Sequence, residues 1–208
     1  ADIILKPALN YDLHIYDRNS DKNLSAYKYP IEYRKNIKSR VSYKKVVKLY
    51  KQYDVFLNIN SVNNSPTMFS RRVFELLACG KSVISSYSLG IETMFPNIVY
   101  LSNSPEETII HLENLLNNKD LRDRNSLLGL REVLNKHTYR HRIEDIFDKI
   151  NLKYQKYTEP KVTVITCTKR HNSRENILNN FLNQKYENKE LIIILNNNNM
   201  DENEWRKG

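Results

Sequence analysis

Arginine and glutamate side chains interrupt the apolar residues of the segment SPTMFSRRVFELLACG, residues 65–80. On a helix, Arg72 and Glu75 would project to the same side, because residues three apart are neighbours. A guanidinium at this place could bind a phosphate, and the carboxylate could accept hydrogen bonds from the two hydroxyl groups of a ribose. The alternative is a surface ion pair of Arg71 or Arg72 with Glu75, which contributes only about 0.3 kcal/mol.

The helix that carries these residues is predicted to begin near Pro66, with Ser65 as its N-cap, and to end at Gly80, a usual place for a left-handed C-cap. The free N–H groups of its first turn would favour an anion. One stripe of the helix is apolar and is expected to face the core: Phe69, Val73, Leu76 and Leu77.

Short apolar runs alternate with segments of helical spacing between residues 12 and 154. Strands are predicted at Asp12–Asp17, Asp54–Ile59, 82–86 and Ile98–Leu101, and helices at 42–53, 65–80, 104–118, about 120–135 and about 139–154. Such alternation predicts an α/β fold with a Rossmann-like parallel sheet, helices on both faces and a ligand beyond the carboxyl ends of the strands.

A polar segment that contains Pro160, YQKYTEPK, interrupts this alternation. We expect a domain boundary there, with a first domain of residues 1–155 and a second of residues 156–208. The second begins anew with a strand (161–167), a helix (173–184) and a strand (190–195), followed by a polar run. This is one β-α-β unit, too short to include the rest of a domain.

The composition predicts a folded protein with a basic surface: 40% of the 208 residues are hydrophobic, and the net charge is +9. That charge suits an anionic partner, whether nucleic acid, a phosphorylated ligand or a membrane surface. No zinc-finger spacing or ribonucleoprotein motif accompanies it, so no nucleic acid is expected. The sequence has neither a membrane-spanning apolar run nor a signal peptide. We expect a cytoplasmic location, and a peripheral position at the inner face of the membrane stays open.

The two cysteines, Cys79 and Cys167, stand far apart in apolar surroundings, so buried thiols are expected rather than a disulfide. Neither cysteine has a metal-ligand partner at a suitable spacing.

The region NINSVNNSPTMFSRRVFELLACGKSVISSYSLGIETMF, residues 58–95, resembles the signature region of group 1 glycosyltransferases of the spore-maturation-protein type. In that group an Asn is followed by Arg-x-Phe-Glu, Ala-Cys-Gly and a Val-Ile-Ser strand. The matching positions here are Asn60, 72–75, 78–80 and 83–85. The segment His137–Phe147 also resembles the terminal helix of the group, so the resemblance covers about residues 10–155.

The resemblance implies the donor-binding, C-terminal half of a GT-B glycosyltransferase, which transfers a sugar from a nucleoside-diphosphate sugar to an acceptor. By this resemblance Arg72 is the catalytic cation that faces the diphosphate, and Glu75 binds the donor ribose. It implies no metal and no other cofactor, because cationic groups stabilise the leaving diphosphate. The further residues expected at the donor are Asn60, Ser65, Thr67, Phe69, Ser70, Ser86 and Gly90.

The sequence departs from the broader group at Thr67, where those enzymes carry a second glutamate that contacts the sugar. Two interpretations remain. One is a transferase of cell-surface or spore polysaccharide or glycoconjugate synthesis, weakly active or inactive here because the acceptor-binding half is missing. The other is a degenerate module that binds a nucleotide sugar without transferring it. A basic nucleic-acid-binding protein is a third class, supported by net charge alone.

Residues 159–199 resemble the opening of family 2, GT-A-type glycosyltransferases. The matching features are Thr168 at the end of a strand, the helix end 182–186 and a second strand end at Asn196 and Asn197, where the family has paired acids. The resemblance implies the truncated start of a second glycosyltransferase domain.

Overall fold

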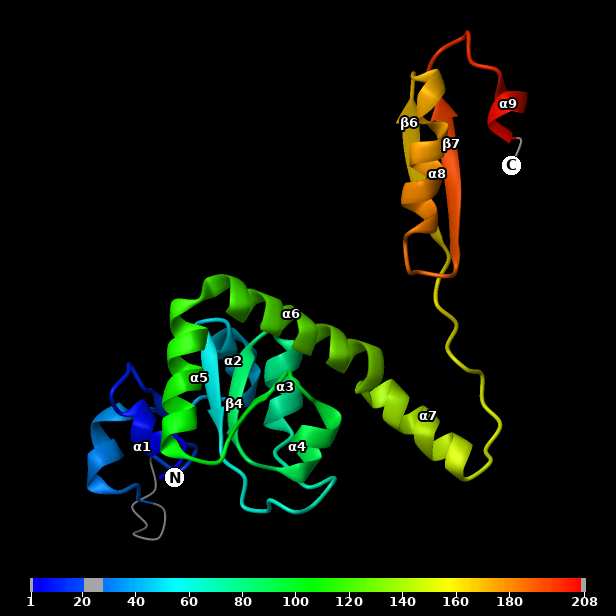
Figure 1. Ribbon diagram of the computed structural model, residues 1–208. Coiled ribbons are helices and arrows are strands. Elements are labelled where there is room, and N and C mark those ends of the chain that lie inside the picture. Colours follow the sequence, from blue (N-terminus) through cyan, green and yellow to red (C-terminus); the bar gives the residue numbers. More distant parts are fainter. Residues whose placement is uncertain (1, 21–27, 207–208) are drawn as a thin grey trace. The chain divides into compact units, whose positions relative to one another are not determined.

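Figure 1 shows the computed structural model of the protein, which describes residues 2–20 and 28–206. The chain divides into two compact units, Ala1–Asn151 and Leu152–Gly208, called unit 1 and unit 2 below. The division falls a few residues before the boundary predicted between residues 155 and 156. The identity of unit 2 as the start of a GT-A domain stays a prediction.

Unit 1 has an α/β fold built on parallel strands, as predicted. β3, β4 and β5 pair in that order to form a parallel sheet, and β1 pairs in parallel with β2. The strands are β1 (Ile15–Tyr16), β2 (Ile37–Lys38), β3 (Val55–Asn58), β4 (Ser82–Ser86) and β5 (Tyr100–Ser102). The helices are α1 (Leu5–Ala8), η2 (Ile31–Asn36), α2 (Tyr43–Tyr50), α3 (Arg72–Ala78), α4 (Leu89–Met94), α5 (Pro105–Asn117), α6 (Lys119–Lys136) and α7 (Tyr139–Lys149).

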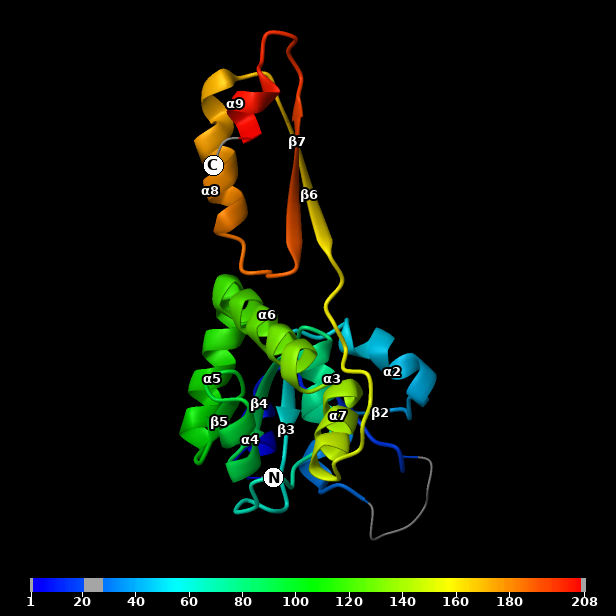
Figure 2. The ribbon, with the colours of Figure 1, turned by 90° about the vertical axis from the view of Figure 1, so that its right-hand side faces the viewer.

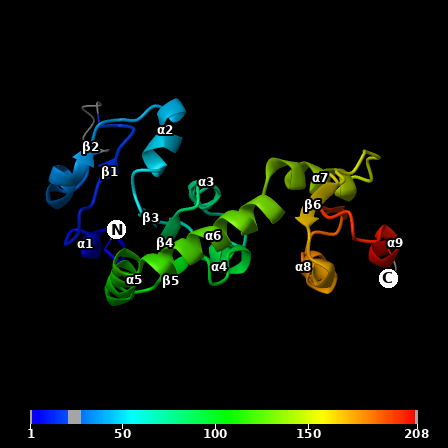
Figure 3. The same ribbon diagram turned by 90° about the horizontal axis from the view of Figure 1, so that it is seen from above.

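Helices cover both faces of the three-stranded sheet (Figures 2 and 3). Val83 and Ile84 are successive residues of the central strand β4, so their side chains point to opposite faces. Val83 joins a cluster with residues of α3 and α6, whereas Ile84 joins one with α1 and α5, and both side chains are fully buried. This two-sided packing confirms the predicted Rossmann-like arrangement.

The N-terminal segment closes the second face of the sheet. Ile4 is buried in the same cluster as Leu112 and Leu115 of α5. The hydroxyl of Thr108 donates a hydrogen bond to the carbonyl oxygen of Ile3 at 2.7 Å. Residues about a hundred positions apart in the sequence therefore complete one half of the core together.

The start of α3 differs from the prediction. The helix begins at Arg72, and residues 65–70 form a loop. Ser65 caps only a turn, since its Oγ accepts hydrogen bonds from the N–H groups of Thr67 and Met68 at 3.4 and 3.1 Å. The loop follows tertiary contacts instead of helical propensity: the ring of Phe69 stacks on that of Phe74 at 5.3 Å.

The end of α3 agrees with the prediction. Gly80 has a φ of +65°, the left-handed region that favours glycine. The N–H of Gly80 donates to the carbonyl of Leu77 at 2.9 Å, and that of Lys81 donates to Leu76 at 3.1 Å, which is the Schellman pattern. The apolar stripe is confirmed for Val73, Leu76 and Leu77, which are buried, whereas Phe69 packs against the same cluster from the loop before the helix.

Unit 2 is a single β-α-β unit with one uncovered sheet face. Two parallel strands, β6 and β7, pair along their whole length, and α8 lies against one face of this sheet (Figure 1). The other face exposes Ile165, Ile192 and Ile194, as well as Cys167. The prediction that both cysteines are buried is therefore wrong for Cys167, and Cys79 is half-buried. The elements are β6 (Val162–Thr168), η3 (His171–Ser173), α8 (Arg174–Leu182), β7 (Lys189–Leu195) and α9 (Glu202–Arg206).

Replacing Gly80 by alanine should lower the free energy of unfolding by about 1 kcal/mol, the cost of a left-handed backbone at a residue with a Cβ. An added Cβ would meet no atom within 4 Å, so the loss would come from the backbone alone. Asparagine tolerates this conformation better, and Gly80→Asn is therefore the matched control with a smaller loss. Urea denaturation followed by circular dichroism measures both. Equal stability of Gly80→Ala and the wild type would contradict a left-handed backbone conformation at Gly80.

The pH dependence of stability should depend on His137. Its ring packs edge-on against Phe95 at 5.1 Å, and burial lowers its pKa, with Arg142 adding to the effect. Below pH about 6.5 the unfolded chain therefore takes up a proton more readily than the folded chain. This contribution to stability is present above that pH and is lost as the pH falls. His137→Phe should show a shallower loss of unfolding free energy between pH 7 and 5, measured by urea denaturation; identical slopes would refute it.

Candidate functional site

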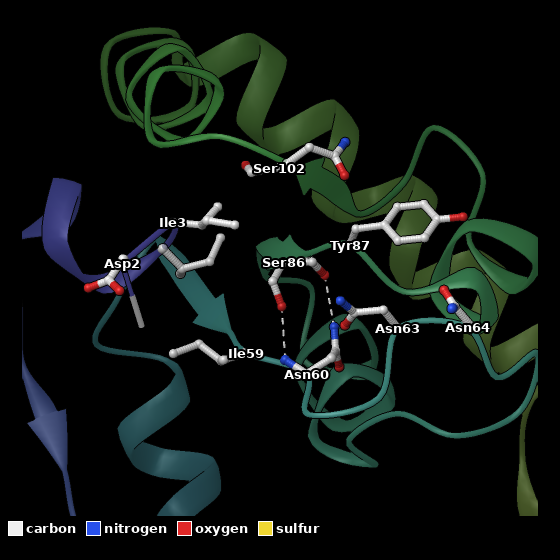
Figure 4. A pocket seen from close by; sticks show the side chains of 11 residues that line it. Asp2, Ile3, Ile59, Asn60, Asn63, Asn64, Ser86, Tyr87 and Ser102 are labelled. Carbon is white, nitrogen blue, oxygen red and sulfur yellow. Dashed lines mark hydrogen bonds between the residues drawn. The ribbon is translucent and has the colours of Figure 1, made fainter.

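A cavity of about 380 Å³ lies where the strands of the three-stranded sheet end (Figure 4). Its wall contains residues at or just after the carboxyl ends of β3, β4 and β5, which is where open parallel sheets bind ligands. The lining residues are Asp2, Ile3, Ile4, Ile59, Asn60, Asn63, Asn64, Ser86, Tyr87, Ser102 and Asn103.

The cavity wall offers amide and hydroxyl groups and little charge. Among the described residues that line it, none is a lysine or an arginine, and the charged one is Asp2. Ser102 is fully buried, and its Oγ has no hydrogen-bond partner among the described residues. Such a wall can exchange hydrogen bonds with a hydroxyl-rich, uncharged group, and a buried hydroxyl without a partner gains most from such a bond.

A hydrogen-bonded brace joins the ends of β3 and β4 beside the cavity. The side-chain amide of Asn58 donates to Asn60 Oδ1 at 3.0 Å and to Ser85 Oγ at 2.9 Å. The amide of Asn60 donates to Ser85 Oγ and to the carbonyl of Ser86. The backbone N–H of Asn60 donates to Ser86 Oγ at 2.9 Å, as Figure 4 shows. The brace fixes this corner of the cavity before any ligand enters.

Two of the residues predicted at the donor, Asn60 and Ser86, line the cavity. Both already hydrogen-bond to each other within the brace. The structure places Ser65, Thr67 and Ser70 in the loop before α3, outside the wall; Thr67 is exposed, and Ser70 Oγ accepts the N–H of Arg72 at 3.3 Å.

Phe69 and Gly90 contact each other rather than the cavity. A Cβ added to Gly90 would lie 2.8 Å from the Phe69 ring and 3.0 Å from the carbonyl oxygen of Pro66. The N–H of Leu89 also donates to the carbonyl of Asn63 at 2.8 Å. These contacts hold the loop before α3 on α4, and in this way they position Asn63 at the cavity.

Glu75 pairs with Arg71, so the alternative of an ion pair along the helix holds for these two residues. Glu75 Oε1 accepts a hydrogen bond from Arg71 Nε at 3.0 Å, and Oε2 accepts one from the hydroxyl of Tyr50 at 3.4 Å. The Arg72 side chain is exposed and lies near Tyr50, whose pKa burial raises and the Arg72 charge partly lowers again. The side chains of Arg72 and Glu75 thus lie near Tyr50 of α2, and neither residue lines the cavity.

The sequence reasoning missed Asn58, Asn63, Ser102 and Asn103, as well as Asp2. A signal for most of them was present: each strand of the sheet ends in small polar residues, in the segments LNIN, ISSY and LSNS. Such residues at the carboxyl ends of adjacent parallel strands come together at one edge of the sheet.

A family model described as glycosyl transferase-like matches residues 4–148. The chain belongs to this glycosyl transferase-like family. The match includes the three-stranded sheet, the cavity wall from Ile4 onward and the segment that carries Arg72 and Glu75. Family membership supports glycosyl transfer, with a sugar donor and an acceptor as substrates. No curated protein and no solved structure matched the chain.

Between residues 2 and 20 and between 28 and 206, no helix is long and apolar enough to cross a membrane. Within the same ranges, no group of three or more His, Cys, Asp or Glu side chains is placed to hold a metal ion.

Removing the amide of Asn58 should destabilise the protein through the brace. Asn58→Ala leaves Asn60 Oδ1 without its donor and removes one of the two amide donors of the buried Ser85 Oγ, and we expect a loss of about 2 kcal/mol in unfolding free energy. Asn64→Ala is the control, because Asn64 is exposed on the same cavity wall and should change stability by less than about 0.5 kcal/mol. Thermal and urea denaturation compare them; equal losses would argue against the brace.

Proposed function

We propose that unit 1 is the donor-binding half of a GT-B glycosyltransferase and that it binds a nucleoside-diphosphate sugar in the cavity beyond β3, β4 and β5. The observation that carries this proposal is the position of the cavity, at the carboxyl edge of a parallel sheet within the segment that matches the family. Ligand binding at this edge follows from the topology, since the loops that leave the strands converge there.

The lining of the cavity supports a model in which the uncharged part of the donor and its diphosphate bind at two neighbouring places. The uncharged, hydroxyl-bearing part fits the cavity, whose wall supplies the Asn63 and Asn103 amides and the Ser102 hydroxyl. The diphosphate would extend toward α3, where Arg72 stands in no ion pair with a described residue. A guanidinium there would stabilise the negative charge that develops on the leaving diphosphate, without a metal.

Glu75 would bind the ribose in this proposal, and its role requires that it exchange partners. Its carboxylate now accepts from Arg71 and Tyr50. The side chain of Arg71 is 67% exposed and that of Glu75 is 29% exposed, so solvent screens the guanidinium and the pair holds the carboxylate only weakly. Two ribose hydroxyl groups could therefore replace the guanidinium at little cost.

The wider setting extends the same proposal. The protein would act in the cytoplasm, as a hexosyltransferase of the spore-maturation-protein type in cell-surface or spore polysaccharide or glycoconjugate synthesis. The acceptor would bind mainly to a separate half of the parent enzyme. Unit 2 would be the start of a GT-A domain, with Thr168 at the end of β6 near its nucleotide.

The alternative is a degenerate module that binds the nucleotide sugar without transfer. Two observations favour it: Thr67 is exposed in the loop where related enzymes use a glutamate, and none of the described lining residues is cationic. Turnover decides between the two, because a transferase releases the nucleoside diphosphate when supplied with its acceptor half and a binding module does not.

Isothermal titration of the 208-residue chain with uridine and guanosine diphosphates, and with their sugars, tests the proposal. Asn63→Ala/Asn103→Ala should raise the Kd of the nucleotide sugar about tenfold by removing two ligand hydrogen bonds. The matched control is Asn114→Ala/Asn117→Ala, two exposed amides on α5, which should leave Kd unchanged. Glu75→Gln should reduce the preference for the ribose nucleotide over its deoxyribose counterpart. Absence of binding to every nucleotide tested would refute the proposal.

A further inference from the structure

The positive charge of the protein is concentrated in one segment. Residues 28–53 contain nine lysines and arginines and one acidic residue, Glu32, so this segment carries +8 of the net charge of +9. The rest of the chain is almost neutral. The nine basic residues are Lys28, Arg34, Lys35, Lys38, Arg40, Lys44, Lys45, Lys48 and Lys51.

The segment belongs to unit 1, and most of its basic side chains lie on the surface. It contains η2, β2 and α2, and Figures 2 and 3 show β2 and α2 on the side of the sheet away from α5. Eight of the nine basic side chains are exposed, and Lys38 is half-buried. Arg40 is set aside, and the other eight form no ion pair with a described residue. The charge of these eight residues is therefore available to a partner in solution.

Apolar side chains stand exposed among these charges. Ile31 is 75% exposed, Tyr43 76% and Val47 50%. On α2, Val46 and Tyr50 point to the core, whereas Val47 and the lysines lie on the outer side. A short helix with one packed edge and an outer surface of lysine, tyrosine and valine has the composition that lies in the interface of a bilayer.

We infer that residues 28–53 form a surface that binds anionic lipid bilayers, with the lysines at the phosphate groups and Ile31, Tyr43 and Val47 in the interface. Each lysine or arginine near an anionic bilayer strengthens the attraction, and exposed apolar side chains add a contact that salt does not screen. This inference does not rest on the proposed function, since no residue of the segment lines the cavity.

Nucleic acid suits this surface less well than a bilayer. Proteins that bind single strands without sequence preference place aromatic side chains in a row to stack on successive bases. Tyr43 is the one largely exposed aromatic side chain among the described residues of the segment, and aliphatic residues take the other apolar positions. Aliphatic side chains gain free energy by leaving water for lipid and gain little from a base face.

Sedimentation with vesicles tests the inference. The full chain should sediment with vesicles made of equal parts of phosphatidylcholine and phosphatidylglycerol, and not with vesicles of phosphatidylcholine alone. Lys44→Glu/Lys45→Glu/Lys48→Glu should reduce partitioning about 100-fold. The control Arg124→Glu/Arg131→Glu/Lys149→Glu changes the net charge equally at exposed cations of α6 and α7, and should keep most of the binding.

A second variant separates interfacial contact from simple attraction. Tyr43→Ser/Val47→Ser should bind almost normally at low salt and lose its binding at a lower salt concentration than the wild type does. Circular dichroism would establish that all variants are folded. Absence of binding to anionic vesicles, equal losses in the two charge-reversed variants, or binding to single-stranded oligonucleotides without binding to vesicles would each overturn the inference.

Discussion

The central strand β4 must be covered on both faces, and most of unit 1 is arranged to satisfy this requirement. Val83 and Ile84 are adjacent in the sequence and fully buried on opposite sides of the sheet. A parallel strand of this kind is stable only when a helical layer lies on each side. Chain connections between parallel strands supply those helices, and they also place every strand end, and so the cavity, at one edge of the sheet.

The same requirement explains which features could be predicted from the sequence. The apolar stripe of α3 and its stop at Gly80 follow from local spacing and from one backbone conformation, and both agree with the structure. The start of α3 depends on where the Phe69 ring packs. The Phe69 ring packs against Gly90, where the absence of a side chain leaves room for the ring. No local pattern around Ser65 predicts this contact.

The sequence likewise predicted some residues of the candidate site and not others. The resemblance supplied Asn60 and Ser86, which the fold brings together at the cavity. It could not supply Asn63, Ser102 or Asn103, because their proximity depends on the ends of three strands that meet only in three dimensions. Arg72 and Glu75 lie within one helical turn, yet the partner of Glu75 is Arg71, four residues earlier on the helix surface. The sequence spacing allows Glu75 to pair with either Arg71 or Arg72. The hydrogen bond from Tyr50 of α2 also holds the Glu75 carboxylate, and sequence spacing does not predict that contact.

The hydrogen bond between Thr108 and Ile3 has a consequence for how the protein is made. During synthesis from the N-terminus, the first helix emerges long before the helix against which it packs. Ile4 therefore stays exposed until α5 has left the ribosome. Closing a loop of that length is slow compared with local pairing. Unit 2 needs no such delay, since its two strands flank a single short helix. Unit 1 thus depends on a late, long-range closure, whereas the strands that pair in unit 2 lie 27 residues apart in the sequence.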